Sequence, residues 1–354
     1  MEPRRSAARR PAARRPAAPP DPDDPRPQRL RALTDLLTPT AVRLAVSLGV
    51  PDVLATGPRT ADAIAACCGT DPRATLGLLR RLVTCDVLEE VRPRVFALGE
   101  LGEPLLDDHL RAFLDLDGAA GHLDRAWAGL GHAVRTGTAA YPQVFGRGFW
   151  DHLAADPALA ASFDAYMDQW AAVWVPAVAP GLAARAAHSI VDVGGGTGGL
   201  LAAVLEQDPT LFGTLVEQEA SAERARERFT AAGLDERTSI VEGSFFDALP
   251  PGEPVYVLAQ VVHDWPDDAA VAILRRCAEA LPAGGRVLLV ERVPDPDHPS
   301  RDHVVMDLRM LVVFGARERT RAEFAELARQ AGLTLTSVED AAHGLSFVEL
   351  RRAG

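Results

Sequence analysis

The sequence of 354 residues contains no lysine and no asparagine, and all 37 of its basic residues are arginine. Without lysine, no Schiff base can form between an enzyme amine and a carbonyl substrate, which excludes aldolase-type and pyridoxal phosphate mechanisms. The phosphate-binding G-K-S/T loop of nucleoside triphosphatases is excluded for the same reason.

Cysteine is scarce: the chain has four, Cys67, Cys68, Cys85 and Cys277. Their spacing matches neither a metal-binding motif nor a disulfide framework. We therefore expect no metal site, and we expect buried structural thiols in a protein of the reducing cytoplasm. No apolar run reaches the roughly 20 residues that span a bilayer, so we expect no membrane partner.

The charge is unevenly distributed along the chain. Residues 1–27 contain seven arginines, eight prolines and no apolar block, and this composition predicts a disordered tail. The net charge of the chain is −12, and the tail is positive by three charges, so residues 28–354 carry about −15. An acidic body repels phosphate backbones, which argues against nucleic acid as a partner.

The most informative segment is S-I-V-D-V-G-G-G-T-G-G at residues 189–199. Its apolar, β-branched start predicts a buried parallel strand, and a helix-like pattern follows the glycines. Such a turn brings backbone and a helix N-terminus close to a ligand. About twenty residues later comes Glu217, at a place where an acid suits the ribose hydroxyls of a nucleoside. The segment predicts a cofactor that contains adenosine.

The glycines alone leave two cofactor classes open. Gly194, Gly196 and Gly199 satisfy the G-x-G-x-x-G pattern of dinucleotide-binding folds, which would make the protein an NAD(P)-dependent oxidoreductase. Gly194, Gly196 and Gly198 equally satisfy the G-x-G-x-G loop of enzymes that use S-adenosylmethionine (SAM). The rest of the chain has to decide between them.

Residues 28–105 form a first predicted domain, mainly helical. Thr60 caps one helix, Asp71-Pro72 begins a second, and short strands are predicted at 87–91 and 95–98. Helix, helix, hairpin is the pattern of a winged helix, which serves either DNA binding or dimerisation. Nine arginines against nine acids make this domain neutral, whereas a DNA-binding domain should be basic. We therefore favour dimerisation, and a winged-helix regulator is the alternative.

The remainder predicts an α/β architecture. Residues 106–188 are helix-rich and aromatic, and residues 189–354 alternate strand and helix patterns, with strands at 190–193, 214–217, 239–242, 255–259 and 286–291. This order is typical of a doubly wound parallel sheet, a Rossmann-like domain. Ligands bind such sheets beyond the carboxyl ends of the strands. We therefore expect the functional residues just after each strand.

Polar and aromatic residues do follow these strands. Ser244 and Phe245 come after the third, where a small polar group and a ring suit the edge and face of adenine. His263 comes after the fourth strand, in V-V-H-D-W. The fifth strand ends at Glu291, and Glu318 follows later in R-E-R-T.

These motifs resemble one known family, the SAM-dependent O-methyltransferases related to plant caffeic-acid methyltransferases and bacterial polyketide-tailoring methyltransferases. The matching elements, in the family's order, are V-D-V-G-G-G-T-G-G, G-S-F-F-D, V-V-H-D-W, L-L-V-E and G-A-R-E-R-T. The resemblance covers essentially all of the chain after the tail. It implies a homodimer formed through the N-terminal domain, and methyl transfer to a hydroxyl, expected to be a phenol, of an aromatic secondary metabolite.

The resemblance also implies roles for single residues. His263 matches the general base, Glu291 and Glu318 match the acids that hold its ring, and Asp264 adjoins them. The implied SAM-binding residues are Asp192, Gly194, Gly196, Gly198, Glu217, Gln218, Gly243, Ser244, Phe245, Phe246 and Trp265. The implied acceptor pocket consists of Trp150, Phe163, Met167, Trp170, Met306, Met310 and Phe314.

Two positions depart from the family's pattern. Ser244 stands where aspartate is common, and Ala259 stands where lysine is frequent. A lost charge-assisted hydrogen bond costs on the order of 1–3 kcal/mol, so we expect weaker SAM affinity. Some relatives have lost the base and run other reactions, such as hydroxylation. The intact H-D-W favours methyl transfer here, and a relative diverted to another reaction is the alternative.

Overall fold

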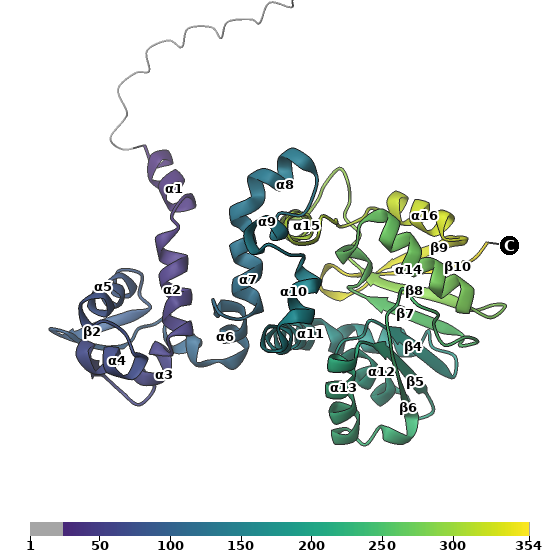
Figure 1. Cartoon of the computed structure of the whole chain (residues 1–354), viewed down its shortest axis with the longest axis horizontal. Helices are drawn as coiled ribbons and strands as arrows, with labels where there is room; N and C mark the ends of the chain where they lie inside the picture. Colours follow the sequence, from purple (N-terminus) through teal and green to yellow (C-terminus); the bar gives the residue numbers. More distant parts are fainter. Residues whose placement is uncertain (1–23, 354) are drawn as a thin grey trace, which may run out of the picture.

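The computed structural model describes residues 24–353. Figure 1 shows three parts in a row: a small N-terminal domain, a bundle of helices in the middle, and an α/β domain at the far end. The predicted tail lies outside the described residues up to residue 23. The first helix, α1 (Arg26–Leu33), already begins inside the segment predicted as tail.

The N-terminal domain has the predicted winged-helix pattern. Thr60 accepts a hydrogen bond from the amide of Ala63 at the start of α4, and Asp71 accepts one from Ala74 at the start of α5. Such caps satisfy amides that have no partner within the helix. A short strand that the sequence pattern did not predict, β1, pairs with β3. The elements are α2 (Leu37–Ser47), α3 (Val50–Leu54), β1 (Arg59–Thr60), α4 (Ala61–Cys68), α5 (Pro72–Val83), β2 (Leu88–Arg92) and β3 (Val95–Leu98).

The cysteines follow the prediction only in part. All four are free, and Cys277 is buried in the α/β core. Cys68 and Cys85 are half-buried, whereas Cys67 is exposed on α4. The expectation of burial is wrong for Cys67 because its position faces away from the apolar side of that helix, which Ile64 and Ala65 form.

The middle part is a bundle of helices, as predicted, but residues 106–188 do not complete it. Val312 and Val313 of α15 (Arg301–Phe314) pack in its apolar core with Tyr141 and Phe149. The last third of the chain therefore returns to this layer, among α8, α9 and α10 in Figure 1. Its other elements are η1 (Glu103–Leu106), α6 (Asp108–Leu114), α7 (Ala119–Arg125), η2 (Ala126–Gly129), α8 (Leu130–Thr136), α9 (Tyr141–Phe145), α10 (Phe149–Ala155) and α11 (Pro157–Ala183).

The α/β domain has a sheet of seven strands in the order β6-β5-β4-β7-β8-β10-β9. The five predicted strands are confirmed and run parallel: β4 (Ser189–Val193), β5 (Phe212–Glu217), β6 (Thr238–Glu242), β7 (Val255–Ala259) and β8 (Arg286–Glu291). Two further strands, β9 (Leu333–Asp340) and β10 (Ser346–Arg352), make the sheet mixed. β10 is antiparallel to both β8 and β9.

Helices cover both faces of this sheet. Along β4, Val191 and Val193 pack on one side with α14 and α16, while Ile190 packs on the other side with α11 and α12. This alternation follows from the two-residue period of a strand. The covering helices are α12 (Gly199–Gln207), α13 (Glu219–Ala231), α14 (Asp267–Ala280) and α16 (Arg321–Gln330), with short turns η3 (Asp235–Arg237), η4 (Val262–Asp264) and η5 (Ala342–Gly344).

The strand order reverses between β4 and β7, because successive strands from β4 run outward through β5 and β6 and then resume on the opposite side. At such a switch point the loops diverge and leave a crevice for a ligand. None of the helices in residues 24–353 combines the length and the apolar character that crossing a bilayer requires.

Candidate active site

Two adjoining cavities open at the carboxyl ends of the strands. The larger, of about 550 Å³, is lined from the loops after β4, β5, β6 and β7. The smaller, of about 280 Å³, lies toward the helical bundle and is lined by α7, α11 and α15. Both are lined by Phe163, Met167, Gln260 and Asp264, so these four residues mark the passage between them.

The glycine loop after β4 forms the floor of the larger cavity. Gly194 has φ +73°, and a Cβ atom there would lie 3.2 Å from the ring of Phe245. Gly196 has φ +59°, and a Cβ there would meet no atom within 4 Å, so its backbone faces open space. The amide of Gly196 donates to Oε2 of Glu217 across 3.1 Å. The loop therefore presents backbone and one carboxylate to a ligand.

Two of the predicted cofactor-binding glycines have other surroundings. Neither Gly198 nor Gly243 is among the residues that line the larger cavity. A Cβ atom on Gly198 would lie 2.5 Å from the ring of Phe229, so this glycine allows α12 to pack closely on α13. The amide of Gly243 donates to the carbonyl of Glu217. Both glycines shape the loops that carry the lining residues.

Two acids line the larger cavity, Asp192, which is buried, and Glu217, which is half-buried. Asp192 is 2% exposed, and neither of its carboxylate oxygens has a hydrogen-bond partner among the described residues. Burial, and next the charge of Glu217, raise the pKa of Asp192 to about 7, and burial also raises the pKa of Glu217. Glu217 accepts from the amides of Gly196 and Gln218, so the carboxyl group without a partner is that of Asp192. Such a group favours a cationic ligand that carries hydrogen-bond donors.

The loop after β6 brings to the larger cavity the residues for which the sequence predicts contacts with adenine. Ser244, Phe245 and Phe246 all line the larger cavity, and so does Gln218 after β5. The hydroxyl oxygen of Ser244 accepts from the amide of Phe246 at 3.2 Å, which leaves its own O–H free to donate. Ala259, the second departure from the family's pattern, also lines this cavity.

A layer of stacked aromatic rings forms one wall of the larger cavity. The rings of Trp150 and Trp265 are parallel within 9° and their centroids are 5.8 Å apart. Phe245 and Phe246 meet the edge of Trp265, and Phe314 stacks on the other ring, Trp150. The predicted acceptor residue Trp150 therefore lines the larger cavity and not the smaller one, and its ring contacts two residues of the smaller cavity, Phe163 and Phe314.

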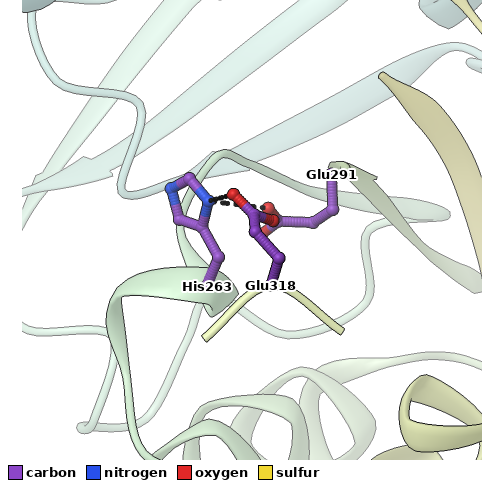
Figure 2. Close-up of side chains that lie close together, drawn as sticks. All are labelled: His263, Glu291 and Glu318. Carbon is purple, nitrogen blue, oxygen red and sulfur yellow. Dashed lines mark hydrogen bonds and ion pairs between the residues drawn. The ribbon is translucent and has the colours of Figure 1, made fainter. Parts of the chain in front are cut away.

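His263 lies at the wall of the smaller cavity, in the short turn η4 after β7. Its Nδ1 atom is 3.0 Å from Oε1 of Glu318, a hydrogen bond, and 3.7 Å from Oε2 of Glu291. Figure 2 shows both carboxylates on one side of the ring and the second ring nitrogen turned away from them. Because Glu318 accepts from Nδ1–H, the Nε2 atom is left as the basic nitrogen.

The two glutamates hold the ring in different ways. Glu318 bonds the imidazole directly, whereas Oε1 of Glu291 accepts from the backbone amides of Val261 and Val262. The turn is also fixed from behind by Arg319, which is 0% exposed and donates to the carbonyls of Val262 and Trp265. The segment after α15 thus supplies Glu318, which bonds the ring of His263, and Arg319, which bonds the backbone on either side of that residue.

The acids set the protonation of the histidine. Burial opposes the charged ring, but Glu318, Glu291 and Asp264 outweigh it and raise the pKa of His263 from 6.5 to about 10. Burial raises the pKa of Asp264 to about 7, and burial also raises the pKa of Glu291. Oδ1 of Asp264 lies 3.5 Å from Nε2 of the ring, on its cavity side. With a pKa of about 10, the ring of His263 is a positively charged imidazolium at pH 7.

The same three side chains satisfy a second geometric description. One ligand atom from each of His263, Glu291 and Glu318 lies within 4.8 Å of the other two, and all three residues are buried. Imidazole and carboxylates are ligands that several divalent metals accept. The arrangement is therefore compatible with either a proton-transfer triad or a metal site. Removal of divalent metal would abolish activity only if the three side chains are metal ligands.

The smaller cavity gathers most of the predicted acceptor residues. Phe163, Met167, Trp170, Met306, Met310 and Phe314 line it, from α11 and α15. Sequence patterns did not bring these two helices together, because about 130 residues separate them in the chain and helix packing is not encoded locally. Flat and thioether side chains of this kind suit an aromatic ligand.

Several polar lining residues were not predicted. Gln260 directly follows β7, lies between the two cavities, and has the left-handed φ of 55°, which is unusual for a residue other than glycine. The rule that ligands meet the ends of strands would have indicated it. Arg43, Asp124 and Arg309 also line the smaller cavity, and no sequence motif marked them.

Comparison with protein families decides what kind of protein has this pair of cavities. Residues 127–334 match the O-methyltransferase domain, and residues 30–108 match the O-methyltransferase dimerisation domain. The chain belongs to the O-methyltransferase family. The resemblance inferred from the motifs is thereby confirmed, and so is the assignment of the winged helix to the dimerisation domain of this family.

Curated relatives of this O-methyltransferase cover nearly its whole length. The 2,7-dihydroxy-5-methyl-1-naphthoate 7-O-methyltransferase of Streptomyces carzinostaticus is 45% identical over 91% of this chain and 96% of its own length. Aclacinomycin 10-hydroxylase RdmB of Streptomyces purpurascens is 43% identical over 90% of this chain and 88% of its own length. Relatives at similar identity thus include both a methyltransferase and a hydroxylase.

A solved structure supports the fold and the cofactor class of this O-methyltransferase. The O-methyltransferase NcsB1 from neocarzinostatin biosynthesis, with S-adenosyl-L-homocysteine and 1,4-dihydroxy-2-naphthoic acid, superposes with a TM-score of 0.84 at 44% identity, covering 92% of this chain and 98% of that chain. A second structure of NcsB1 contains SAM. Of the two cofactor classes that the glycines left open, the nicotinamide one is therefore set aside: the protein is a SAM-dependent O-methyltransferase.

Proposed function

We propose that this enzyme transfers the methyl group of SAM to a phenolic hydroxyl of an aromatic secondary metabolite, with His263 as general base. The observation that carries the proposal is the position of His263. Its ring lies on the wall of the smaller cavity, held by Glu318 on one side, while the glycine-loop cavity adjoins through Gln260 and Asp264. SAM and the acceptor would therefore bind in separate, adjoining cavities, with the base on the wall of the acceptor cavity.

The residues of the larger cavity fit SAM, which supplies an activated methyl group when bound. Asp192 offers two unpartnered carboxylate oxygens to a cation, and the loop from Gly194 to Gly196 leaves open space at its backbone. Glu217 would hold the ribose hydroxyls, while Ser244 and Phe245 would hold the edge and face of adenine. These five positions follow one another around the ends of β4, β5 and β6.

His263 serves proton removal in a specific way. A phenol has a pKa of about 10 and is a poor nucleophile at pH 7. The acids raise the pKa of His263 to about 10 as well, so a proton between Nε2 and the phenol oxygen is shared on nearly equal terms. Neutral histidine with phenol and imidazolium with phenolate hold the same number of protons. Electron density develops on the phenol oxygen as its proton moves to Nε2, and that oxygen then accepts the methyl group.

Most of the remaining rate comes from placement. In-line methyl transfer needs the two reacting atoms at attack distance, and holding them there avoids a large entropy cost. The ring layer of Trp150, Trp265 and Phe314 and the methionines of α11 and α15 restrict a flat acceptor to the smaller cavity. The relatives named above act on or bind naphthoates and other aromatic metabolites, which supports an acceptor of that class and a place in antibiotic biosynthesis in the cytoplasm.

The hydroxylase among the relatives keeps one alternative open, a diverted reaction on an aromatic polyketide. The two are separated by incubating purified enzyme with SAM and a panel of hydroxylated naphthalenes and anthraquinones. Methyl transfer is supported by products heavier by one methylene unit together with stoichiometric S-adenosylhomocysteine. Products that gain an oxygen, with SAM unconsumed, would overturn the proposal in favour of the hydroxylase-like reaction.

We also propose that the enzyme is a homodimer through its N-terminal domain. Leu30, Leu33, Leu36 and Leu37 on α1 and the start of α2 are 63%, 84%, 81% and 62% exposed. Figure 1 shows this segment projecting from the body of the domain. An apolar face of this kind needs a partner, and a second copy supplies one within the dimerisation domain. Sedimentation of the Leu33→Glu, Leu36→Glu double variant should give a monomer where the wild type gives a dimer.

A further inference from the structure

A charged group stands among the apolar residues of the smaller cavity. Arg43 of α2 and Arg309 of α15 both face the carboxylate of Asp124 on α7. The guanidinium of Arg43 lies 2.5 Å from one oxygen of Asp124, and that of Arg309 lies 3.7 Å from the other. Two positive charges against one negative charge leave this part of the wall with a net positive charge.

Arg309 has hydrogen-bond donors that the protein does not use. Its Nη1 atom donates to the hydroxyl of Tyr166 across 3.0 Å, whereas its Nη2 atom lies 3.7 Å from Asp124, too far for a hydrogen bond. Arg43, by contrast, donates to the carbonyl of Phe113 and pairs closely with Asp124. Because Arg309 lines the smaller cavity, its Nη2 donors are available to an acceptor atom of a ligand there.

We propose that Arg309 binds a carboxylate of the acceptor, so that the enzyme's substrate is an aromatic hydroxy acid. This rests on the proposed function, because it names the class of the acceptor for the same site. A guanidinium has planar, parallel donors that match the two oxygens of a carboxylate, and it remains charged at all relevant pH values. The net positive charge attracts the acid group even though Asp124 neutralises part of it.

The charges around His263 orient such an acceptor. Asp264, Glu291 and Glu318 lie at or behind the imidazole and outnumber its single positive charge, so a carboxylate is disfavoured in that part of the cavity. The acid group is drawn instead to Arg309, which leaves the hydroxyl to meet Nε2 of His263. Like charges placed in this way exclude the reversed orientation and thus select which hydroxyl is methylated.

A purely structural role for Arg309 makes a different prediction. The same side chain joins α15 to α11 through Tyr166 and lies near α7 through Asp124, so it also braces three helices. Loss of a brace would weaken binding of charged and uncharged acceptors alike. Loss of a contact that recognises a carboxylate would instead weaken binding of the charged acceptors alone.

The test compares hydroxynaphthoates with the matching hydroxynaphthamides, which have the same shape and no charge. Binding to the wild-type enzyme loaded with S-adenosylhomocysteine is measured by calorimetry. At least one acid should bind roughly tenfold to one hundredfold more tightly than its amide. In Arg309→Gln that preference should disappear through weaker acid binding, with amide binding unchanged, and Arg309→Lys should restore part of it. Arg329→Gln, which changes an exposed arginine on α16, is the matched control.

Three results would overturn the inference: equal binding of acids and amides across the panel, equal losses for both in Arg309→Gln, or binding of neither. The readout needs no turnover, so it can fail while methyl transfer to uncharged phenols succeeds. Conversely, absence of methyl transfer to any phenol contradicts the proposed function and leaves the carboxylate preference measurable.

Discussion

The Nδ1 atom of His263 lies 3.0 Å from Oε1 of Glu318, although 55 residues separate the two in the sequence. This hydrogen bond fixes the tautomer in which Nε2 is the free base, and the carboxylate stabilises the imidazolium that proton transfer produces. Since Glu318 lies on the segment that follows α15, the helix that lines the acceptor cavity also positions the support of the base.

The charge of Glu318 should be visible in the pH dependence of the reaction. At neutral pH both a phenol with a pKa of about 10 and His263 hold their protons, and one of these two protons must be lost before methyl transfer. The logarithm of kcat/KM of the wild type should therefore rise with pH, with a slope near one between about pH 6 and 9. In Glu318→Gln the hydrogen bond can persist, but the pKa of His263 falls from about 10 toward 6.5.

The profile of that variant should therefore level off at a lower pH, with a maximum rate reduced roughly tenfold because the base is weaker. Glu326→Gln, on an exposed glutamate of α16 that pairs with Arg329, should keep the wild-type profile. A wild-type profile that is already flat above pH 7 would show that the acids do not raise the pKa of His263.

Binding of SAM should release protons from Asp192. The pKa of this buried carboxyl is about 7, so the group is partly protonated at pH 7 before SAM binds. The cationic groups of SAM favour the ionised form, and the proton then leaves. Calorimetry at pH 7 in two buffers of different ionisation enthalpy counts the released protons directly.

Asp192→Asn should abolish this release and weaken SAM binding by roughly tenfold to one hundredfold, because a charge-assisted contact is lost. Asp297→Asn changes an exposed aspartate and serves as the control. Equal proton release in the wild type and in Asp192→Asn would assign the titrating group elsewhere.

Removal of divalent metal separates the two descriptions of the cluster formed by His263, Glu291 and Glu318. If the cluster serves proton transfer, overnight dialysis against EDTA leaves methyl transfer unchanged, because the carboxylates act on Nδ1 and on backbone amides. Loss of activity that Mg²⁺ or Zn²⁺ restores would instead assign these side chains as metal ligands.

Local patterns predicted the elements whose shape depends on neighbouring residues. The cap of Thr60 on α4, the start of α5 at Asp71 and the five parallel strands all appear where the sequence placed them. The rule that ligands meet the ends of strands indicated His263, and the resemblance to the family's motifs indicated Glu318; the structure brings the two side chains into contact.

Long-range packing could not be predicted in the same way. The return of α15 to the helical bundle brings Arg309 beside Asp124, and antiparallel β9 and β10 complete the sheet. The alternating Leu and Thr residues of β9 do carry the two-residue period of a strand, but neither the antiparallel pairing nor the return of α15 can be read from its own segment, since each depends on partners far away in the chain. Gln260 could have been predicted from its place directly after β7, but its left-handed backbone could not, because residue types other than glycine do not indicate it.

The most direct test of the central claim is single-turnover methyl transfer by His263→Ala, measured beside the affinity for S-adenosylhomocysteine. The account predicts a rate lower by roughly 10²–10⁴-fold with cofactor affinity nearly unchanged, since the ring supplies proton removal and does not line the larger cavity. A variant that methylates its acceptor at the wild-type rate would contradict the assignment of His263 as the base.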